Sequence, residues 1–512
     1  MSQAELAPSC SGLGSGRAAD PCIVVICGAA GDLTRRELIP SLFELYQDTL
    51  LPEACAIIGF SRADWDDDTF RRQMRAAHEE FAGPVDPAQW DRFAARLGFV
   101  PGDFTAPADG PYAALARRIA DERQRRSIPD NVLFHLATPP VVYEAIVAKL
   151  ALAGLSRSDG GWRRVVIEKP FGADETSAAH LDQAVRAVFP ESSVYRIDHF
   201  LGKETVQNML VVRFANPSFE PIWNRQYIDH VQITVAEDIG IGTRAGFYEQ
   251  TGVVRDMVQN HLLQLVCMTA IEPPNRFDGA SLRDETVKVL EAIAPPGDTS
   301  VVGGQYGAGV VNGRRVTGYR EEAGVTPGSR TRTYAAVKLE IDNWRWAGVP
   351  FYLRTGKRLS RRLTEVAIQF KPTPHLMFPV DRGQMHSNVL LFRLQPDEGI
   401  VQTFAAKQPG PEVTVTPVTM SFSYANAFGI ARAPRAYAWL LHDAMKGDQT
   451  LFARADWIDR AWRIVDPLIA RWDAASGAGN GGDGFPNYAA GSWGPAAADE
   501  LLRRDGREWR AS

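Results

Sequence analysis

The chain has 512 residues, of which 45% are hydrophobic and 23% charged, a composition typical of a globular protein of roughly two or three domains. This composition excludes collagen-like, coiled-coil and disordered proteins. Lys and Arg number 56 against 61 Asp and Glu, so the net charge is −5 and no global positive field exists to hold nucleic acid or an anionic membrane. We expect neither partner, and an anionic ligand must bind in a local basic pocket.

The five cysteines include no C-x-x-C pair, and their odd number argues against a disulfide framework and for a reducing compartment. Cys22 and Cys27 flank a run of Ile and Val, which predicts that both lie in a buried strand. No apolar run approaches the roughly 20 residues that cross a bilayer. Residues 1–20 carry neither an apolar core nor an Arg-rich amphipathic pattern. We therefore expect a cytoplasmic protein with a short disordered tail at residues 1–20.

The first part of the chain alternates short apolar runs with helical periodicity, as a parallel sheet with crossover helices does. Between the first two runs, leucines at helical spacing predict a helix with Pro40 in its opening turn. The second part, beyond about residue 226, shows the period-two alternation of an antiparallel sheet with one wet face and helices on the other. Residues 476–494 are rich in Gly, Ala and Asn and predict a loop. The expected parallel strands are Ile23–Cys27, Ala56–Phe60, Val132–Ala137 and Val165–Ile167, and the alternating segments lie at 231–235, 337–341, 366–370, 389–394 and 400–404.

The first expected strand ends in GAAGDLT, residues 28–34. Glycines at such a turn let the backbone approach a pyrophosphate at the N-terminus of the following helix. The spacing is G-x-x-G rather than G-x-G-x-x-G, so a plain turn remains the alternative. After the second strand, Arg62 stands where NAD enzymes place a carboxylate for the ribose hydroxyl. A cation there suits a 2′-phosphate and favours NADP, and a solvated loop cation is the alternative.

Two further segments concentrate charged residues, and the first of them follows an expected strand. In VVIEKP, residues 165–170, Lys169 emerges where ligands of open parallel sheets bind, unless it only reaches out to water. In RIDHFLGKE, residues 196–204, His199 and Lys203 are one turn apart if the segment is helical, and both could then donate to one phosphate. A solvated face of mixed charge is the alternative.

An otherwise apolar helix is expected at Val253–Met268. At about 100° per residue, four of its polar side chains fall within an arc of about 140°, which Gln259 does not share, and this arrangement favours a wet cleft over a core histidine. These side chains are Asp256, Asn260, His261 and Gln264. Residues 353–362 form a strongly basic turn that could close over an anionic ligand or could be ordinary surface charge.

The motifs GAAGDLTRREL, IIGFSR, VVIEKPFG, RIDHFLGKE, VVRDMVQNHLLQ and GVPFYLRTGKRL, in this order, closely resemble those of the glucose-6-phosphate dehydrogenase family. The resemblance covers nearly the whole chain. It implies a Rossmann-like coenzyme domain, which we place at 21–197, and a larger β+α substrate and dimerisation domain at 198–512, built on a mainly antiparallel sheet with helices on one face. It also implies a homodimer or homotetramer that oxidises glucose 6-phosphate to the 6-phospholactone with NADP, the first step of the oxidative pentose phosphate pathway.

The resemblance further assigns roles to single residues. It makes His261 the general base and Asp198 the carboxylate that orients it. The substrate-binding residues are then Lys169, His199, Lys203, Glu237, Asp256, Lys357 and Arg362. The cofactor-binding residues are Gly28, Ala29, Gly31, Asp32, Leu33, Arg62 and Lys169, which bridges substrate and nicotinamide.

Three departures from the family pattern stand out. Phe200 replaces a common Tyr, so a phosphate-binding hydroxyl is missing, and Ala30 replaces a Ser or Thr that can touch the cofactor phosphates. Both should weaken binding modestly. Leu363 follows Arg362 where eukaryotic members with a second, structural NADP site have a basic residue, so we do not expect that site.

Two other functions remain open from the sequence. One is a glucose–fructose oxidoreductase-like dehydrogenase of unphosphorylated sugars, and the other is an NADP-sensing protein without catalysis. No metal is expected, because the nine histidines are scattered without i,i+4 pairs.

Overall fold

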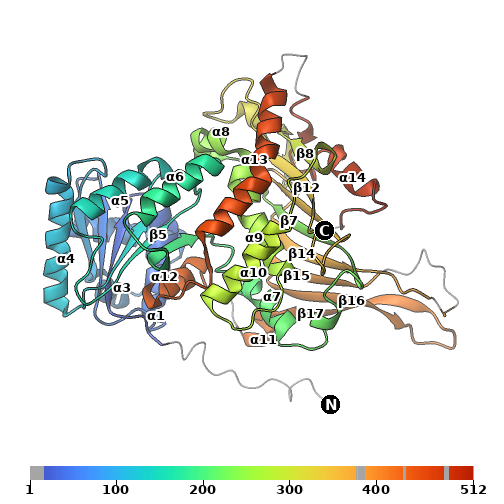
Figure 1. Ribbon diagram of the computed structural model, residues 1–512, viewed down its shortest axis with the longest axis horizontal. Coiled ribbons are helices and arrows are strands. Elements are labelled where there is room, and N and C mark those ends of the chain that lie inside the picture. The colour runs from blue at the N-terminus through green and yellow to red at the C-terminus, as the bar shows by residue number, and fades with distance from the viewer. Residues whose placement is uncertain (1–16, 376, 379–386, 430–433, 478–483, 511–512) are drawn as a thin grey trace. The chain divides into compact units, whose positions relative to one another are not determined.

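The computed structural model describes residues 17–375, 377–378, 387–429, 434–477 and 484–510 (Figure 1). The chain forms two compact units. The first comprises Met1–Lys203, Pro274–Arg283 and Pro434–Asp459, and the second Glu204–Pro273, Asp284–Ala433 and Arg460–Ser512. A single boundary at residue 198 does not describe the two later segments of the first unit. They join it because Phe452 pairs with Ile197 in the sheet and the Arg435 N–H donates to Glu44 over 3.1 Å.

The first unit is built on a sheet in the order β18-β6-β5-β4-β1-β2-β3. Its six parallel strands have the 3-2-1-4-5-6 type of order of a Rossmann fold, and β18 adds an antiparallel edge. The four expected parallel strands are confirmed, and Cys22 and Cys27 are buried. The strands are β1 (Cys22–Cys27), β2 (Cys55–Ser61), β3 (Leu97–Pro101), β4 (Val132–Leu136), β5 (Arg163–Ile167), β6 (Val194–Ile197) and β18 (Phe452–Ala453).

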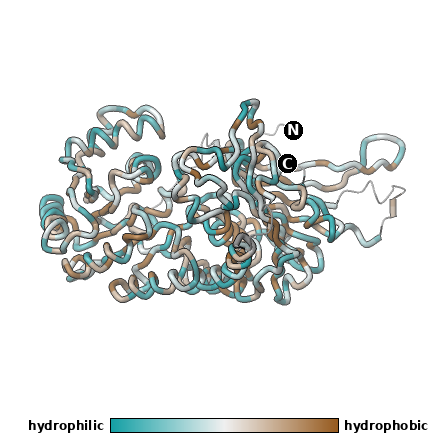
Figure 2. The backbone as a smooth tube through the Cα atoms, turned by 90° about the horizontal axis from the view of Figure 1, so that it is seen from above, coloured by the Kyte–Doolittle hydropathy of each residue, from teal (hydrophilic) through white to brown (hydrophobic). Residues whose placement is uncertain are grey.

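The helices of the first unit begin at clear sequence signals. Asp66, Asp86 and Asp174 each accept a backbone N–H three residues later at the start of α2, α3 and α6, which satisfies one of the free donors of each first turn. Hydrophilic stretches lie mainly on the outer turns of the helices (Figure 2). The helices are η2 (Thr34–Leu38), α1 (Ile39–Gln47), α2 (Asp67–Phe81), α3 (Pro87–Ala94), η3 (Ala108–Tyr112), α4 (Ala113–Arg126), η4 (Pro140–Val142), α5 (Tyr143–Leu152), α6 (Glu175–Arg186), η5 (Glu191–Ser193) and α12 (Ala436–Lys446).

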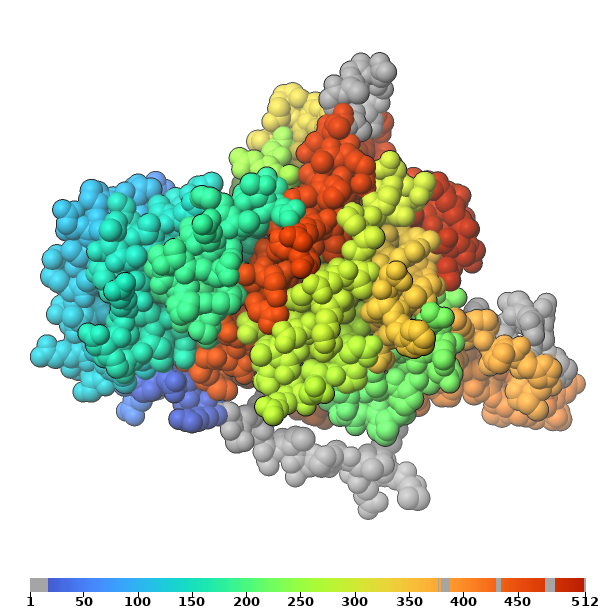
Figure 3. Space-filling model, in the orientation of Figure 1, coloured from blue at the N-terminus to red at the C-terminus, as the bar shows by residue number. Residues whose placement is uncertain are grey.

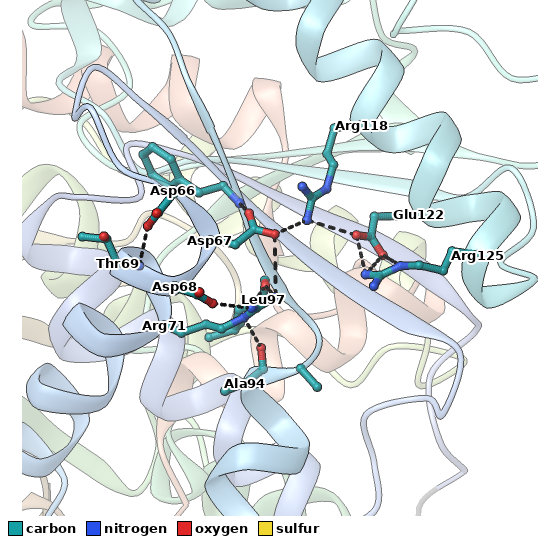
Figure 4. Close-up of polar contacts among 12 residues, drawn as sticks. Asp66, Asp67, Asp68, Thr69, Arg71, Ala94, Leu97, Arg118, Glu122 and Arg125 are labelled. Atoms are coloured by element: carbon teal, nitrogen blue, oxygen red, sulfur yellow. Dashed lines mark hydrogen bonds and ion pairs between the residues drawn. The ribbon is translucent and has the colours of Figure 1, made fainter.

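An ionic network ties α2 to α4 beside the edge strand β3 (Figure 4). Asp67 accepts from Arg118 and from the Phe99 N–H, each over 2.7 Å. Arg118 also lies 3.1 Å from Glu122, which is 4% exposed and is bonded by Arg125 over 2.6 Å. A buried carboxylate needs such partners, so the network stabilises the packing of the two helices.

The second unit contains an eight-stranded sheet in the order β17-β16-β15-β14-β7-β13-β12-β8. All of its pairs are antiparallel except β13 with β7, which run parallel. The strands are β7 (Ile228–Ala236), β8 (Val301–Gly304), β12 (Tyr334–Glu340), β13 (Pro350–Gly356), β14 (Leu363–Phe370), β15 (Val389–Gln395), β16 (Gly399–Lys407) and β17 (Val415–Ser423). Two small sheets join β9 (Tyr306–Gly307) with β19 (Tyr488–Ala489) and β10 (Gly309–Val311) with β11 (Arg314–Val316).

Helices α7 and α9 lie in front of this sheet in Figure 1, and α7 packs on β15. In Figure 3 the orange end of the β15–β17 region protrudes from the second unit at the right of the view. The helices are η6 (Glu220–Ile222), α7 (Glu204–Phe214), η7 (Gly242–Arg244), α8 (Ala245–Val253), η8 (Val254–Leu262), α9 (Leu263–Ala270), η9 (Asp298–Ser300), η10 (Tyr319–Glu321), α11 (Tyr424–Phe428) and α14 (Ala496–Arg503). The helices α10 (Gly279–Glu291) and α13 (Ala455–Gly477) carry residues of both units.

The expectation of a wet sheet face is wrong for the central strand β7. Gln232 and Thr234, which alternate with its apolar residues, are 6% and 2% exposed. The end of the chain covers this face, since Gln232 donates to the Glu508 carbonyl and accepts from the Arg510 N–H, each over 2.8 Å. Period-two alternation therefore marks a polar second face here, but not a solvated one.

The structure also differs from the expected loop at 476–494 and from the expected tail at 1–20. The loop expected at 476–494 contains the end of α13 and strand β19, which pairs with β9, while residues 478–483 lie outside the described residues. Within the tail expected at 1–20, Ala19 is buried and its N–H donates to Leu50, and residues 1–16 lie outside the described part. Among the residues that the structure describes, no helix is long and apolar enough to cross a membrane.

Candidate active site

The glycine turn after β1 has a geometry that only glycine permits at its first position. Gly28 has φ +98°, and a Cβ on it would lie 2.2 Å from the Ala137 carbonyl oxygen. Its own carbonyl accepts from the Gly31 N–H over 2.9 Å and from the Thr34 hydroxyl over 3.2 Å. The turn therefore closes tightly and leads directly into the helix, as a pyrophosphate-binding turn requires.

The other turn residues differ in what they offer. Ala29 is buried against Gly59 of β2, where an added Cβ would come within 2.8 Å of the Ala29 Cβ. Asp32 is exposed and paired with Arg36 over 2.6 Å, so its carboxylate is partly neutralised. Leu33 is half-buried beside the π-helical turn η2. The expected strand, turn and helix are all present.

Arg62 directly follows the last residue of β2 and is exposed. Its charge also lies near Asp103, whose pKa is lowered mainly by the hydroxyl and N–H of Thr105 and to a smaller extent by this guanidinium. Arg62 is thus a solvent-accessible cation at the carboxyl end of β2, where the ribose of a dinucleotide binds in Rossmann folds.

At the end of β5, two neighbouring charged residues have different surroundings. Glu168 is 7% exposed, and its carboxylate bonds His135 and Tyr437. Lys169 is half-buried, and a cis peptide bond joins it to Pro170. Sequence reasoning found Lys169 but missed Glu168, His135 and Tyr437, because Tyr437 is distant in the chain. The only available signal was a histidine in the middle of the apolar strand β4.

The segment after β6 is a series of turns, because α7 begins only at Glu204. The prediction that His199 and Lys203 lie one helical turn apart required a helix at 199–203, and this segment is not helical. Lys203 is 9% exposed, and its ammonium lies 3.9 Å from the centre of the Phe200 ring, so the residue that replaces Tyr supplies a cation–π contact. The imidazole of His199 also lies 5.1 Å from the Phe200 ring, so both basic side chains contact the same ring without a helix.

Asp198 is 3% exposed in this turn and accepts the Phe200 N–H over 2.9 Å. Burial raises its pKa, and the positive charges of His199 and Lys169 act in the opposite direction. The neighbouring Arg196 points its guanidinium to Asp182 and Glu191, over 2.6 and 2.7 Å, and has a structural role.

The polar helix expected at Val253–Met268 is a π-helix over Val254–Leu262 followed by α9. The arc calculated with α-helical spacing therefore does not apply to its first half. All four polar side chains are nonetheless buried, from 1% exposed for His261 to 7% for Asp256. Asn260 donates to the Arg255 carbonyl over 3.0 Å and accepts the His261 N–H, so it fixes the backbone at the histidine. π-Helical turns of this kind are frequent at functional sites.

Lys357 lies at the centre of an ionic cluster in the second unit. Its ammonium is 2.6 Å from Glu237 and 3.9 Å from Asp256, and its side chain is 2% exposed. The pairing of Gly356 with Ala236 in the parallel strands β13 and β7 brings the residues that follow both strands to one edge. The ring of Tyr248 lies 5.2 Å from the ammonium, a neighbour that sequence reasoning missed.

The cluster unites three of the expected substrate-binding residues, but it does not include Arg362. That residue is exposed and donates to Gln395 of β15 over 3.4 Å. The basic turn expected at 353–362 is similarly divided: Arg354 is buried and bonds Thr234, whereas Arg361 is exposed.

Together, a Rossmann sheet with a tight glycine turn and a second unit with a buried lysine between carboxylates define a dinucleotide-dependent dehydrogenase with a separate substrate domain. Two family models match the chain: "Glucose-6-phosphate dehydrogenase, C-terminal domain" over residues 210–510 and "Glucose-6-phosphate dehydrogenase, NAD binding domain" over residues 25–208. The chain belongs to the glucose-6-phosphate dehydrogenase family.

Similar proteins agree over almost the full length. Glucose-6-phosphate 1-dehydrogenase 2 of Mycobacterium tuberculosis is 46% identical over 500 residues, 96% of this chain and 95% of that protein. Glucose-6-phosphate 1-dehydrogenase of Aggregatibacter actinomycetemcomitans is 46% identical over 496 residues, 96% of this chain and 98% of that protein. Among solved structures, a glucose-6-phosphate dehydrogenase in complex with its substrate has a TM-score of 0.87 at 32% identity and covers 97% of this chain and 100% of its own. A Mycobacterium avium glucose-6-phosphate 1-dehydrogenase structure has a TM-score of 0.79 at 36% identity and covers 96% of this chain and 99% of its own.

Proposed function

We propose that this protein oxidises D-glucose 6-phosphate to 6-phospho-D-glucono-1,5-lactone with hydride transfer to NADP. Beside family membership, the observation that carries the proposal is the cluster of Lys357 with Glu237 and Asp256. Carboxylates held by a buried ammonium can accept hydrogen bonds from sugar hydroxyls, while the lysine donates to others. His261 lies on the same helical segment as Asp256, five residues further along.

In this reaction C1 of the sugar loses a hydride and its hydroxyl loses a proton. A nicotinamide dinucleotide held by the glycine turn of the first unit and by Lys169 would supply the acceptor for this hydride. His261 takes the proton, since an imidazole that is neutral near pH 7 is suited to this role and such catalysis contributes about 10²–10⁴ in rate. Asp198 fixes the orientation of the imidazole and stabilises the imidazolium, as a buried carboxylate does for a catalytic histidine.

The first unit fits a dinucleotide. Gly28 and Gly31 shape the turn, with Ala29, Asp32 and Leu33 around it, and no side chain caps the helix that follows, so its N-terminus could bind the pyrophosphate. The exposed cation Arg62 suits the 2′-phosphate of NADP, and no carboxylate stands at that position. Lys169 would then contact both the sugar and the nicotinamide.

The phosphate of the substrate is bound by His199 and Lys203, with Arg362 as a further basic contact. Two cations in one turn supply the local positive pocket that a protein of net charge −5 needs for an anionic sugar. Because Phe200 offers no hydroxyl, we expect modestly weaker phosphate binding than in family members with Tyr.

The decisive experiment compares initial rates on glucose and on glucose 6-phosphate, each with NADP and with NAD. The proposal expects fast reduction of NADP only with the phosphorylated sugar. Preference for unphosphorylated glucose would instead support a glucose–fructose oxidoreductase-like enzyme. NADP binding without turnover of either sugar would support a non-catalytic sensor.

We also propose a homodimer or homotetramer that works in the cytoplasm. Strands β16 and β17 keep partly exposed side chains, and Met420 is 57% exposed, which fits a subunit contact at this end of the sheet. The four described cysteines are buried free thiols, as expected in a reducing compartment. Light scattering of the purified protein gives the mass, and a monomer at assay concentration would contradict the oligomer.

A further inference from the structure

Glu168 has no role in the function proposed above, although its environment is unusual. It is 7% exposed and directly precedes Lys169 at the end of β5. Burying a carboxylate is unfavourable unless hydrogen bonds and charges compensate it. Two other elements of the first unit provide this compensation at the carboxylate, and a third element bonds the backbone carbonyl of the same residue.

Each oxygen of Glu168 has its own partner. Oε1 lies 3.0 Å from Nε2 of His135, a fully buried residue of β4, and Oε2 accepts the hydroxyl of Tyr437 of α12 over 3.1 Å. The Glu168 carbonyl accepts the hydroxyl of Tyr143 of α5 over 3.0 Å. Burial and the Glu168 carboxylate raise the pKa of Tyr437, so its hydroxyl stays protonated and donates. The peptide group that leads to Lys169 is therefore held by β4, α5 and α12.

Tyr437 also contacts the turn after β6. Its ring stacks on the imidazole of His199, with the ring centres 6.3 Å apart and the planes inclined by 11°. One side chain thus bonds the residue beside Lys169 through its hydroxyl and supports His199 through its ring. Lys169 and His199 are the two positions from which we expect the cofactor side and the phosphate of the sugar to be held.

We propose that Tyr437 and Glu168 are positioning residues. They fix the positions of Lys169 and His199 relative to each other, so that both can contact the same substrate molecule. This inference rests on the proposed function. Lysine has a long flexible side chain that loses rotamer freedom when it is ordered. A fixed backbone at its base lowers that cost in the transition state, and small misplacements in such sites reduce rates strongly.

The test separates the two contacts of Tyr437. Tyr437→Phe removes the hydroxyl and keeps the ring, so kcat should fall about 10-fold while the KM for glucose 6-phosphate stays within about 2-fold. Tyr437→Leu removes both contacts and should also raise this KM about 10-fold, because the support of His199 is lost. Glu168→Gln retains an acceptor for Tyr437 but no charge for His135, and should lower kcat less than Glu168→Ala does.

The matched control is Tyr195→Phe. Tyr195 of β6 is also fully buried, and among the described residues its hydroxyl has no hydrogen-bond partner, so this variant should keep both kcat and KM. NADPH binding followed by fluorescence gives the concentration of folded enzyme for each variant. If Tyr437→Phe has the kcat of the control, or if its loss of rate disappears after this correction, the inference is wrong. A wild-type protein inactive on glucose 6-phosphate would instead refute the proposed function.

Discussion

Replacing Lys357 by Met tests the central cluster of the second unit, because Met has a similar length and no charge. The substitution leaves Glu237 and Asp256 without the cation that lies 2.6 and 3.9 Å away. Removing one partner of a buried ion pair costs about 3–5 kcal/mol. We expect the free energy of unfolding to fall by about 3 kcal/mol, since Glu237 is 28% exposed and water screens part of its charge.

The same substitution should also reduce catalysis. Losing a charged hydrogen bond to the sugar costs about 1.5–3 kcal/mol, which lowers kcat/KM about 10- to 150-fold. Denaturation followed by tryptophan fluorescence gives the first quantity, and initial rates of NADP reduction give the second. Arg361→Met is the control, because Arg361 is an exposed cation of the same basic turn, and it should change neither.

A double variant distinguishes structural from functional loss. Adding Glu237→Gln to Lys357→Met removes one uncompensated charge, so part of the stability should return while the activity stays low. A loss of stability below about 1 kcal/mol in Lys357→Met, together with near-normal kcat/KM, would refute the reasoning. Recovery of activity in the double variant would show that the lysine acts only on the fold.

The remaining predictions concern the base, the phosphate, the cofactor and the first unit. His261→Asn should lower kcat by about 10²–10⁴ with little change in KM, and a normal kcat would remove the base assignment. Lys203→Ala should mainly raise the KM for glucose 6-phosphate, and an unchanged KM would exclude its phosphate role. Arg62→Asp should shift the ratio of NADP to NAD activity towards NAD, because a carboxylate repels the 2′-phosphate and accepts a ribose hydroxyl, whereas an unchanged ratio contradicts NADP recognition by Arg62. Glu122→Gln should lower the free energy of unfolding by about 2 kcal/mol. The control is Glu79→Gln, which removes the charge of an exposed ion pair with Arg75 and should lower this free energy by at most about 0.5 kcal/mol. Burial favours the neutral form of Glu122, but hydrogen bonds from Arg125 and Arg126 outweigh it and hold the pKa below 4.5. The Glu122 contribution should therefore be complete above pH 4.5 and vanish as the pH falls through the lower folded pKa, so a difference independent of pH would contradict it.

The sequence predicts the first unit well because its signals are local. The runs of β1, β2, β4 and β5 are short, apolar and followed by turns, and each becomes a buried parallel strand. Gly28 is required by its own backbone conformation, which the G-x-x-G turn indicates without tertiary information. Predictions from local patterns of this kind do not depend on which other elements pack against the segment.

The sequence does not predict the burial and the partners of side chains whose contacts come from distant parts of the chain. Gln232 looks solvent-facing until residues near the end of the chain cover it, and the contact of Glu168 with Tyr437 joins residues 269 positions apart. The spacing around His261 was calculated for an α-helix, whereas η8 is a π-helix with i→i+5 hydrogen bonds, which changes which side chains share a face. The sequence favoured a wet cleft around His261 and a solvent-facing Gln232, whereas the structure buries these polar side chains.

One parallel pair in a mostly antiparallel sheet explains why Glu237 and Lys357 meet. Parallel neighbours end at the same edge, so the residues that follow β7 and β13 are adjacent, whereas an antiparallel pairing would place them at opposite edges. The first unit uses the same principle, since Gly28, Arg62 and Lys169 directly follow or lie within two residues of the ends of β1, β2 and β5. In both units, the expected chemistry therefore depends on strand direction, and a sequence pattern that reports alternation alone cannot supply it.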